Sequence, residues 1–400
     1  MGELPLAGVR IADFSWVLAG PHCTKWLGAM GAEVIKVESH YRPDRFRAVS
    51  PFVDGKSSVD TSVAFNMLNY AKRDCTINLG TEDGQALARR LVESSDVAIE
   101  NFSTGVAERL GLGYDELAKT NPKLVMISAS GLGRTGPDAK MRAFGKSIHA
   151  FTGHTHLTGW PGTPPRGIGG TWTDPVTGVT AVLAILAGLA QARRTGHGLH
   201  MELSMAEATM ALMAEPFLEF LASGAEPQPA GNHSDACVPH NSYRCRDGWI
   251  AIAAHDAEEW QALVRVVGLP GELAALDTVE ARLAQRQAID AALDGWCAAQ
   301  GRDAAVAVLG GAGVCAAPVR RFEELLTDAH FRDRGLIARL SHEGVGSYHI
   351  FKLPWRTVPA LEHRYTPTPR LGQDNEYVFH DVLGLSGEQV RALTAASVLV

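Results

Sequence analysis

One aspartate follows a long stretch of chain that contains no acidic side chain. No Asp or Glu occurs between residues 139 and 173, and Asp174 ends this gap directly before Pro175. The basic residues of the stretch are Lys140, Arg142, Lys146 and Arg166. Such a local positive field suits an anionic substrate or a phosphate group. We expect these cations and a helix N-terminus to lower the pKa of Asp174 and to keep it ionised. Because Asp-Pro is also an ordinary way to begin a helix, helix capping is the alternative to a catalytic role.

Histidine and aromatic side chains lie in the same part of the chain. They are His149, His154, His156, Trp160 and Trp172, with Arg166 among them. A mixture of aromatic and cationic groups is suited to a carboxylic acid, either a dicarboxylic or an aryl-substituted one. We therefore treat His149, His154, Trp160 and Arg166 as candidate substrate contacts.

Two patterns suggest a cofactor or a metal, and other features argue against both. GLGRTG at 131–136 matches G-x-G-x-x-G, but Pro137 follows it, and no acid lies where a ribose contact is expected. A tight glycine turn is the better interpretation. His233, Cys237, His240 and Cys245 fit a zinc knuckle only loosely. We expect no metal, nicotinamide or flavin cofactor.

Strands and helices alternate through the first 130 residues. β-type runs occupy residues 9–14, 33–38, 76–79, 96–101 and 123–130, and helical patterns lie at 22–30, 81–94 and 104–118. This alternation predicts an α/β fold with a parallel sheet. Two Ala-rich helices are predicted at 175–194 and 204–223, so that Asp174 lies at the start of the first.

A second, smaller domain is expected after a linker. Residues 222–232 are rich in Pro and Gly, and residues 230–330 have their own strand at 249–254 and their own helical segments. A helix follows Pro318, a β-like stretch lies near 335–352, and an amphipathic segment at 385–396 ends the chain.

Composition excludes several classes of protein. The chain has 400 residues, 46% of them apolar and 20% charged, which indicates a globular protein of two or three units. With 37 basic and 44 acidic residues it is not expected to bind nucleic acid. Six scattered cysteines and a non-basic start favour the cytoplasm. The uncharged residues 175–192 contain so many Ala, Gly and Thr that we expect a core helix and no membrane association.

Several segments, taken in order, resemble one known family. LAGVRIADFSWVLAGPHCTKWLGAMGAEVIKVE, NYAKRDCTINL, ENFSTGVAERLGLGYDEL, SASGLGRTGP and TWTDPVTGVTAVLAILAGL are similar to the class III CoA-transferases, the formyl-CoA transferase and carnitine CoA-transferase family. CAAPVRRFEELLTDAHFRDRGLI and the closing LGLSGEQVRAL are similar as well. The resemblance covers nearly the whole chain, and the opening segment resembles the benzylsuccinate-type transferases most.

The resemblance implies a particular architecture. A large Rossmann-like domain would comprise residues 1–225 and 335–400, and a small α+β domain residues 230–330. Two chains would interlock, either as a homodimer or as a heterodimer with a paralogous subunit.

The resemblance also implies a chemistry. Asp174 falls on the family's nucleophile, which would form an aspartyl-CoA thioester while CoA moves from an acyl-CoA, by default succinyl-CoA, to a carboxylic acid. Residues that fall at or beside CoA contacts are Val17, Leu18, Ala19, Lys72, Arg73, Asn101, Arg109 and Arg142. Leu18 replaces a side chain that is polar in some members, so a backbone N–H is expected to stabilise the oxyanion.

Two alternatives belong to the same superfamily. An α-methylacyl-CoA racemase would use a His and an Asp for proton transfer, but these fall on Phe144 and Gly145 here. A non-catalytic subunit of a hetero-oligomeric transferase is the other alternative, and the retained Asp174 argues against it.

Overall fold

The computed structural model describes residues 3–400; residues 1 and 2, with which the predicted large domain begins, lie outside it. The chain divides into two compact units. The first contains the residues up to Thr155, Gly167–Ala225 and Gly335–Val400, and the second contains His156–Arg166 and Glu226–Arg334. The segment His156–Arg166 thus belongs to the second unit, which neither its composition nor any motif in it predicts.

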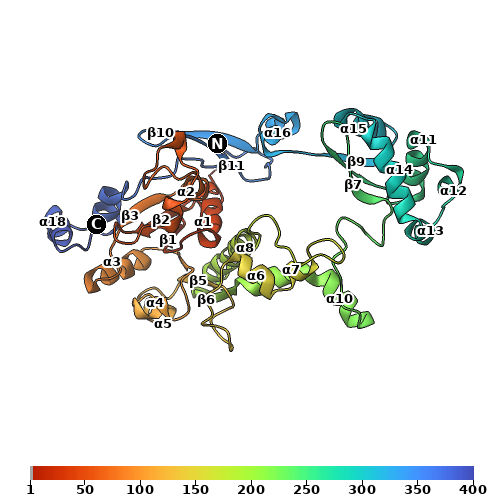
Figure 1. Cartoon of the computed structure of the whole chain (residues 1–400). Coiled ribbons are helices and arrows are strands. Elements are labelled where there is room, and N and C mark those ends of the chain that lie inside the picture. Colours follow the sequence, from red (N-terminus) through yellow and green to blue (C-terminus); the bar gives the residue numbers. More distant parts are fainter. Residues whose placement is uncertain (1–2) are drawn as a thin grey trace. The chain divides into compact units, whose positions relative to one another are not determined.

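A six-stranded parallel sheet forms the centre of the first unit (Figure 1). Its strands are β1 (Arg10–Asp13), β2 (Glu33–Glu38), β3 (Arg73–Thr76), β4 (Val97–Glu100), β5 (Val125–Ser130) and β6 (Leu199–Ser204). They lie in the order β3-β2-β1-β4-β5-β6, and all neighbours are parallel. The prediction of an α/β fold with a parallel sheet is therefore confirmed. β3 begins three residues before the predicted run at 76–79, and β6 was not predicted.

Helices cover both faces of this sheet because its strands are apolar on both sides. On one face Ile11 and Val97 pack against α1 (Ala19–Ala29) and α8 (Thr173–Thr195). On the other face Ala12 and Ala98 pack against α3 (Glu82–Glu93), α5 (Tyr114–Thr120) and the C-terminal residues. Successive residues of a strand thus enter two different cores, as the pleat requires.

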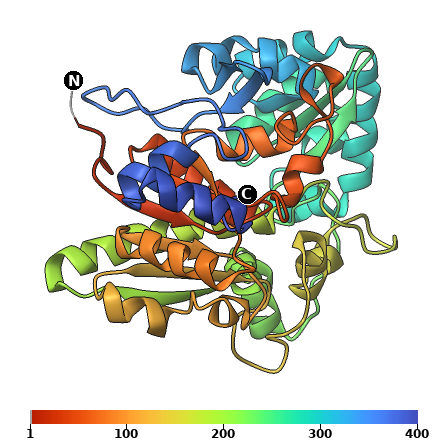
Figure 2. The ribbon, with the colours of Figure 1, turned by 90° about the vertical axis from the view of Figure 1, so that its left-hand side faces the viewer.

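The C-terminal segment completes the first unit. The His40 N–H donates to the Val400 carbonyl at 3.0 Å, and the Asn78 N–H donates to the Val398 carbonyl at 2.8 Å. Figure 2 shows this blue segment, with α18 (Gly387–Ala395), against the red and orange strands and helices from the N-terminal part. The last residues are consequently part of the α/β unit that holds β1–β6.

Helix α8 packs closely on α1 through a glycine. A Cβ atom at Gly178 would lie 2.8 Å from the Ala19 carbonyl oxygen and 3.1 Å from His22 Cβ. Such distances leave no room for a side chain, so Gly178 sets the separation of the two helices. Of the helices in residues 3–400, α8 alone is long and apolar enough to cross a membrane, by length and composition only; here it packs on α1, β5 and β6.

Two predicted helices are interrupted. The one predicted at 104–118 is two short helices, α4 (Val106–Arg109) and α5, separated by Gly111 with a φ of 65°. The one predicted at 204–223 consists of α9 (Met205–Met210), a 3-10 turn (Ala211–Met213) and α10 (Ala214–Ser223). The remaining named elements of this unit include α2 (Val63–Asn69), α6 (Gly145–Phe151), α7 (His154–Leu157, which runs into the second unit) and the antiparallel pair β10 (Ile337–His342) and β11 (Gly346–Phe351).

The second unit has its own sheet and core. The antiparallel strands β7 (His240–Arg244), β8 (Trp249–Ala253) and β9 (Cys315–Val319) lie in the order β7-β8-β9. Helices α11 (Ala257–Val267), α14 (Arg286–Ala298) and α15 (Arg302–Gly311) contribute Trp260, Leu293 and Leu309 to its core. The unit is therefore α+β, with a hydrophobic cluster separate from those of the first unit.

Candidate active site

The strand order has its switch point between β1 and β4. The chain leaves β1 toward β2 on one side and later enters β4 on the other, so the connections diverge at the carboxyl ends of these two strands. In open α/β sheets, ligands bind at such a topological switch point. The segment 14–18, which we call the β1 loop, follows β1 here, and Asn101 follows β4.

Side chains from neighbouring strands hold the backbone of the β1 loop. Asn101 makes two hydrogen bonds to Trp16: its Oδ1 accepts from the Trp16 N–H and its Nδ2 donates to the Trp16 carbonyl, both at 2.8 Å. The Lys36 ammonium donates to the Ser15 carbonyl at 2.6 Å. Asp13 accepts from the Ser15 N–H at 2.9 Å. Hydrogen bonds to Ser15 and Trp16 therefore hold the backbone of this loop in place.

Val17 has a left-handed backbone, which is unusual for a β-branched residue. Its φ is +70°, and its N–H donates to both carboxylate oxygens of Asp44, at 3.0 and 3.1 Å. Strain of this kind tends to occur at functional sites. Leu18, the N-cap residue of α1, makes no side-chain capping hydrogen bond to the first turn of this helix.

Asp174 lies in the first turn of α8 and is half-buried. The N-cap residue of this helix is Trp172, with no side-chain capping bond, so the interpretation of Asp174 as an N-cap is wrong. The Thr173 hydroxyl donates to Asp174 Oδ2 at 3.2 Å. A Cβ atom at Gly145, the first residue of α6, would lie 2.5 Å from the same oxygen. Gly145 thus leaves the space that this carboxylate occupies.

Packing brings the start of α1 next to Asp174. Gly178, one helical turn after Asp174, lies against Ala19, and Ala19 shares a small apolar cluster with Ile148 of α6. Because α6 begins at Gly145, beside the Asp174 carboxylate, the starts of α1, α6 and α8 converge. The candidate site therefore joins the end of the β1 loop to Asp174.

The expected low pKa of Asp174 is wrong. Burial raises the pKa of this carboxyl group, and the Thr173 hydroxyl and a backbone N–H oppose that effect only in part. None of the described cations is among the groups that shift it, and Lys140, Arg142 and Lys146 are exposed. Desolvation therefore outweighs the basic character of the preceding sequence.

The structure separates the two adjacent basic residues that were predicted to contact CoA. Lys72 is fully buried, with its ammonium 3.2 Å from Asp13 Oδ2 and 2.7 Å from Asn69 Oδ1. Burial lowers the pKa of Lys72 to about 8, in spite of Asp13. Arg73 turns toward the starts of β2 and β3, where it pairs with Glu33 and Asp374 at 3.3 and 2.8 Å. Neither side chain points to Asp174 in this structure.

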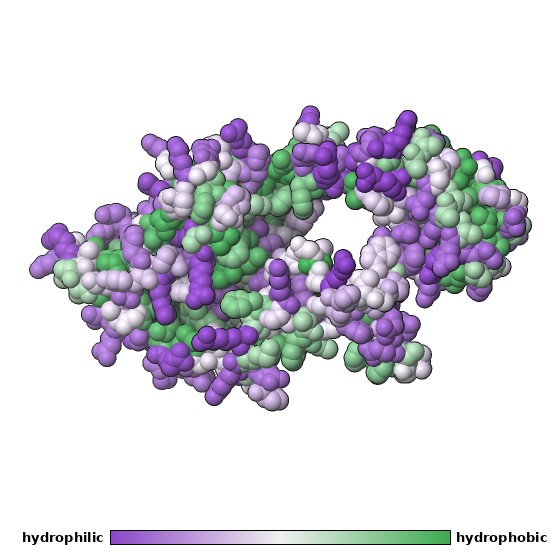
Figure 3. Space-filling view, viewed as in Figure 1, coloured by the Kyte–Doolittle hydropathy of each residue, from purple (hydrophilic) through white to green (hydrophobic). Residues whose placement is uncertain are grey.

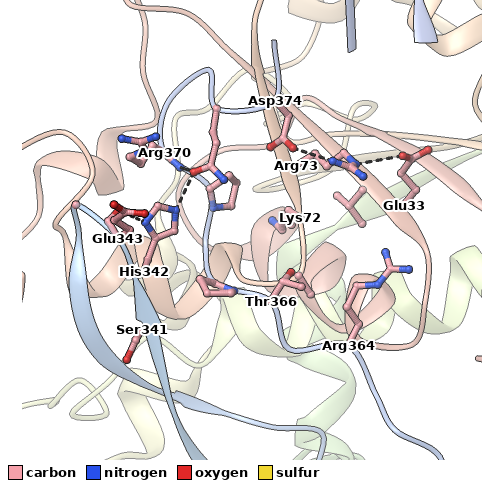
Figure 4. Close-up of a pocket in the computed structure, with 16 residues that line it drawn as sticks. Glu33, Lys72, Arg73, Ser341, His342, Glu343, Arg364, Thr366, Arg370 and Asp374 are labelled. Atoms are coloured by element: carbon pink, nitrogen blue, oxygen red, sulfur yellow. Dashed lines mark hydrogen bonds and ion pairs between the residues drawn. The ribbon is translucent and has the colours of Figure 1, made fainter. Parts of the chain in front are cut away.

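Arg73 lines a polar cavity of about 960 Å³. Figure 4 shows its ion pairs with Glu33 and Asp374, and Arg364, Arg370 and His342 lie around the same space. The cavity opens where β2 and β3 begin, whereas the β1 loop follows the end of β1. It therefore lies at the opposite end of the strands from the β1 loop.

The remaining predicted residues lie at several places. Val17, Leu18, Ala19 and Asn101 form the β1 loop region described above, while Arg109 and Arg142 are exposed. His149 is buried, its ring 5.8 Å from that of His154, and its Nε2 has no hydrogen-bond partner among residues 3–400. Burial lowers the pKa of both histidines, so they are neutral at neutral pH.

Trp160 and Arg166 belong to the second unit. Trp160 contacts His233 edge-on there, with ring centroids 6.3 Å apart, and both Trp160 and Arg166 are exposed. His233 also lies 3.2 Å from Asp290. Within the described residues no group of three or more His, Cys, Asp or Glu could hold a metal ion.

Three further residues contribute to this region and have only weak signals in the sequence. His22 lies beside Gly178, and burial, with nearby Lys25 and Lys72, lowers its pKa to about 3. Gly145 is distinctive in the sequence only because it stands where a racemase has its acid. Asp44 follows β2 in an ordinary loop, and its contact with Val17 depends on tertiary structure.

In GLGRTG, Gly133 and Gly136 both have a φ of 87°, as a glycine turn requires.

The fold and this site define a doubly wound α/β protein in which the Asp174 carboxylate lies near the start of the helix that follows the β1 loop. Comparison with known proteins is specific: the chain belongs to CoA-transferase family III, whose model matches residues 6–375. It is therefore a CoA-transferase that uses CoA thioesters as substrates.

Relatives of known activity match over almost the whole chain. A succinyl-CoA–D-citramalate CoA-transferase of Chloroflexus aurantiacus is 34% identical, covering 99% of this chain and 98% of its own. The beta subunit of a succinyl-CoA–L-malate CoA-transferase of the same species is 30% identical, with the same coverage. A crystal structure of a CAIB/BAIF family protein from Brucella suis is 31% identical and has a TM-score of 0.86, covering 95% of this chain and all of that one.

Proposed function

We propose that the enzyme transfers CoA through an aspartyl-CoA thioester on Asp174. A carboxylate oxygen of Asp174 attacks the acyl-CoA carbonyl carbon, the C–S bond breaks, and CoA leaves as a thiolate from a mixed anhydride. The thiolate then attacks the aspartyl carbonyl carbon, and the donor acid leaves as a carboxylate. The acceptor carboxylate repeats these steps in reverse.

The placement of Asp174 is the observation that supports this mechanism best. Its carboxylate is half-buried and lies against Gly145, without a cation among the groups that shift its pKa. A partly desolvated carboxylate is a stronger nucleophile than a solvated one, and a shielded site protects the anhydride and the thioester from water.

The β1 loop and the start of α1 supply the groups for CoA. The uncapped N–H groups at Leu18 and Ala19 would stabilise the oxyanion that forms on the thioester carbonyl. We assign Val17 and Asn101 to the thioester end, and the exposed Arg109 and Arg142 to the CoA phosphates. Since Lys72 pairs with Asp13, we assign it a supporting role beneath the loop.

The substrates are an acyl-CoA donor and a carboxylic acid acceptor. Two relatives are named for succinyl-CoA and for D-citramalate or L-malate, which are hydroxydicarboxylic acids. We therefore propose succinyl-CoA as the donor and a short dicarboxylic acid as the acceptor. His149 and His154, on α6 and α7 next to the site, are the candidate acceptor contacts in the first unit.

A second chain is part of the proposal. Helix α10 has no buried residue, and Phe217, Leu218 and Leu221 are 55%, 63% and 64% exposed. Figure 3 shows apolar residues, in green, at the surface along this helix. An apolar surface of this kind favours coverage by another protein chain. We propose an interlocked homodimer in the cytoplasm, with a paralogous partner as the alternative because one relative is a beta subunit.

Transfer assays test the function. The protein is incubated with succinyl-CoA and each of several dicarboxylic acids, and the new acyl-CoA is followed by chromatography. Product is expected with wild type and none with Asp174→Ala. A racemase would instead exchange the α-proton of an acyl-CoA for deuterium without any acceptor; Phe144, which is exposed, offers no group for this. Activity that appears only after a paralogous chain is added would indicate a hetero-oligomer.

A further inference from the structure

Asp44 is buried and charged, and the mechanism above gives it no role. It lies in the connection that follows β2, and its side chain is fully buried together with that of Lys36. The two side chains form an ion pair at 3.0 Å. Asp44 Oδ1 also accepts from the Phe46 N–H at 3.0 Å and so caps the 3-10 turn Arg45–Ala48. Capping does not require a buried lysine partner, and a buried ion pair is weak evidence for stability as such, so the pair needs a further explanation.

The pair contacts the β1 loop at two points. Both oxygens of the Asp44 carboxylate accept from the Val17 N–H, and the Lys36 ammonium donates to the Ser15 carbonyl as well as to Asp44. Asn101 holds Trp16 between these points. The ion pair thus holds the loop backbone on both sides of Trp16, at Ser15 and at Val17.

Val17 would not adopt its conformation without such a constraint. A valine with a φ of +70° is strained, whereas glycine reaches this region freely. The next residues, Leu18 and Ala19, begin α1 beside Asp174. Relaxation of Val17 toward an extended backbone would therefore turn the first N–H groups of α1 away from the crevice.

We propose that Asp44, fixed by Lys36, is a positioning residue that holds Val17 in the left-handed conformation and so aims the start of α1 at the reacting thioester. This inference rests on the proposed function. It predicts that Asp44 affects the acylation of Asp174 more than it affects the binding of acyl-CoA.

The test compares Asp44→Asn with Asp60→Asn. Asp60 pairs with Arg47 at 2.9 Å in a neighbouring group of ion pairs, and its side chain is 22% exposed. Within residues 3–400 its side-chain hydrogen bonds go to Arg47 and the Leu371 N–H and do not reach the β1 loop, so it serves as the control. We expect Asp44→Asn to slow single-turnover acylation of Asp174 about 100-fold, the effect of a displacement near 1 Å, with KM changed less than about threefold. Asp60→Asn is expected to leave both values near those of wild type.

Two further variants separate positioning from folding. Asp44→Glu keeps the charge next to Lys36, so the fold is retained, and its longer side chain should still displace Val17 and slow acylation. Val17→Gly in the Asp44→Asn background should recover at least about tenfold, because glycine needs no constraint to reach this φ. Rescue by a change at Val17 would not follow from a purely structural role of Asp44.

Amide hydrogen exchange of the peptide 14–19 gives a readout that does not require activity. We expect faster exchange in Asp44→Asn than in wild type or Asp60→Asn. Unchanged exchange, or an acylation rate equal to that of Asp60→Asn, would overturn the proposal. If wild type itself never acylates Asp174 with any donor, the proposed function fails, and the exchange result still decides whether Asp44 positions the loop.

Discussion

At the scale of single residues, Asp174 is half-buried in the first turn of α8. Burial raises its pKa, and Gly145 provides the space for its carboxylate. A raised pKa makes the ionised oxygen more basic and more nucleophilic, provided that the working pH stays above it. Both properties lead to measurable consequences.

The rate of acylation should fall as the pH is lowered, with a midpoint above the usual Asp value of about 3.9. Protonation removes the nucleophile, and because burial raises the pKa, this loss begins at a higher pH than for an exposed aspartate. A pH profile of single-turnover acylation measures the midpoint. A midpoint below the usual value would mean that cations, and not burial, control this carboxylate.

Gly145→Ala should lower the acylation rate by about 100-fold and should also destabilise the protein, because the space around Gly145 is full. The added methyl group would lie 2.1 Å from Thr171 Cγ2 and 2.5 Å from Asp174 Oδ2, so both Thr171 and the carboxylate must move. Ala150→Ser, at an exposed position of the same helix α6, is the control. Equal rates for the two variants would show that the Asp174 carboxylate does not react from this position.

At the scale of elements, the contact of α1 with α8 fixes the distance between the first turn of α1 and Asp174. Gly178 allows this contact, because the Ala19 carbonyl lies where its side chain would be. The opposite case exists in the second unit, where Gly295 in α14 has open space around its Cβ position. The same substitution should therefore have opposite effects at these two glycines.

Gly178→Ala should destabilise the protein by about 1–3 kcal/mol, since overpacking outweighs the better helix propensity of alanine. Gly295→Ala should stabilise by about 0.5–1 kcal/mol, because only helix propensity changes. Thermal or urea unfolding of both variants measures these effects. A stabilised Gly178→Ala would mean that α1 and α8 are less closely packed than described.

The elements that the sequence predicted well are those with strong hydrophobic periodicity. β2 has the predicted bounds, 33–38, because it is buried along most of its length. β6 was missed because this edge strand alternates partly buried residues with the exposed His200 and Glu202. At Asp174 the position was evident, but the sign of its pKa shift depends on burial, which a list of nearby charges cannot show.

Contacts distant in sequence explain the other failures. Lys72 looked available for a phosphate, but Asp13, 59 residues earlier, pairs with it inside the first unit. The hydrogen bond from the Val17 N–H to Asp44 likewise joins two separate segments, the β1 loop and the connection that follows β2. Neither contact has a local signature in the chain.

At the scale of the whole molecule, the exposed apolar surface of α10 favours an assembly. Each leucine on this helix would gain about 1.5–3 kcal/mol if a partner buried it completely. The protein is therefore expected to be a dimer in solution, as the family resemblance also implies.

Leu218→Glu together with Leu221→Glu should weaken dimer formation at least about 100-fold, because two central apolar contacts become charges. Light scattering over a range of protein concentrations measures the dissociation constant. Val358→Glu, at a fully exposed position, is the control. A dimer as tight as wild type in the double variant would place the interface elsewhere.

The most direct test of the central claim follows oxygen from the acceptor into Asp174. In the proposed sequence the acceptor carboxylate attacks the aspartyl-CoA thioester, and when the anhydride is cleaved one acceptor oxygen stays on the aspartate. A single turnover with a dicarboxylic acid labelled with oxygen-18, followed by peptide mass spectrometry, should therefore place one heavy oxygen on the Asp174 side chain. Acyl-CoA product without any label in the Asp174 peptide would contradict the mechanism.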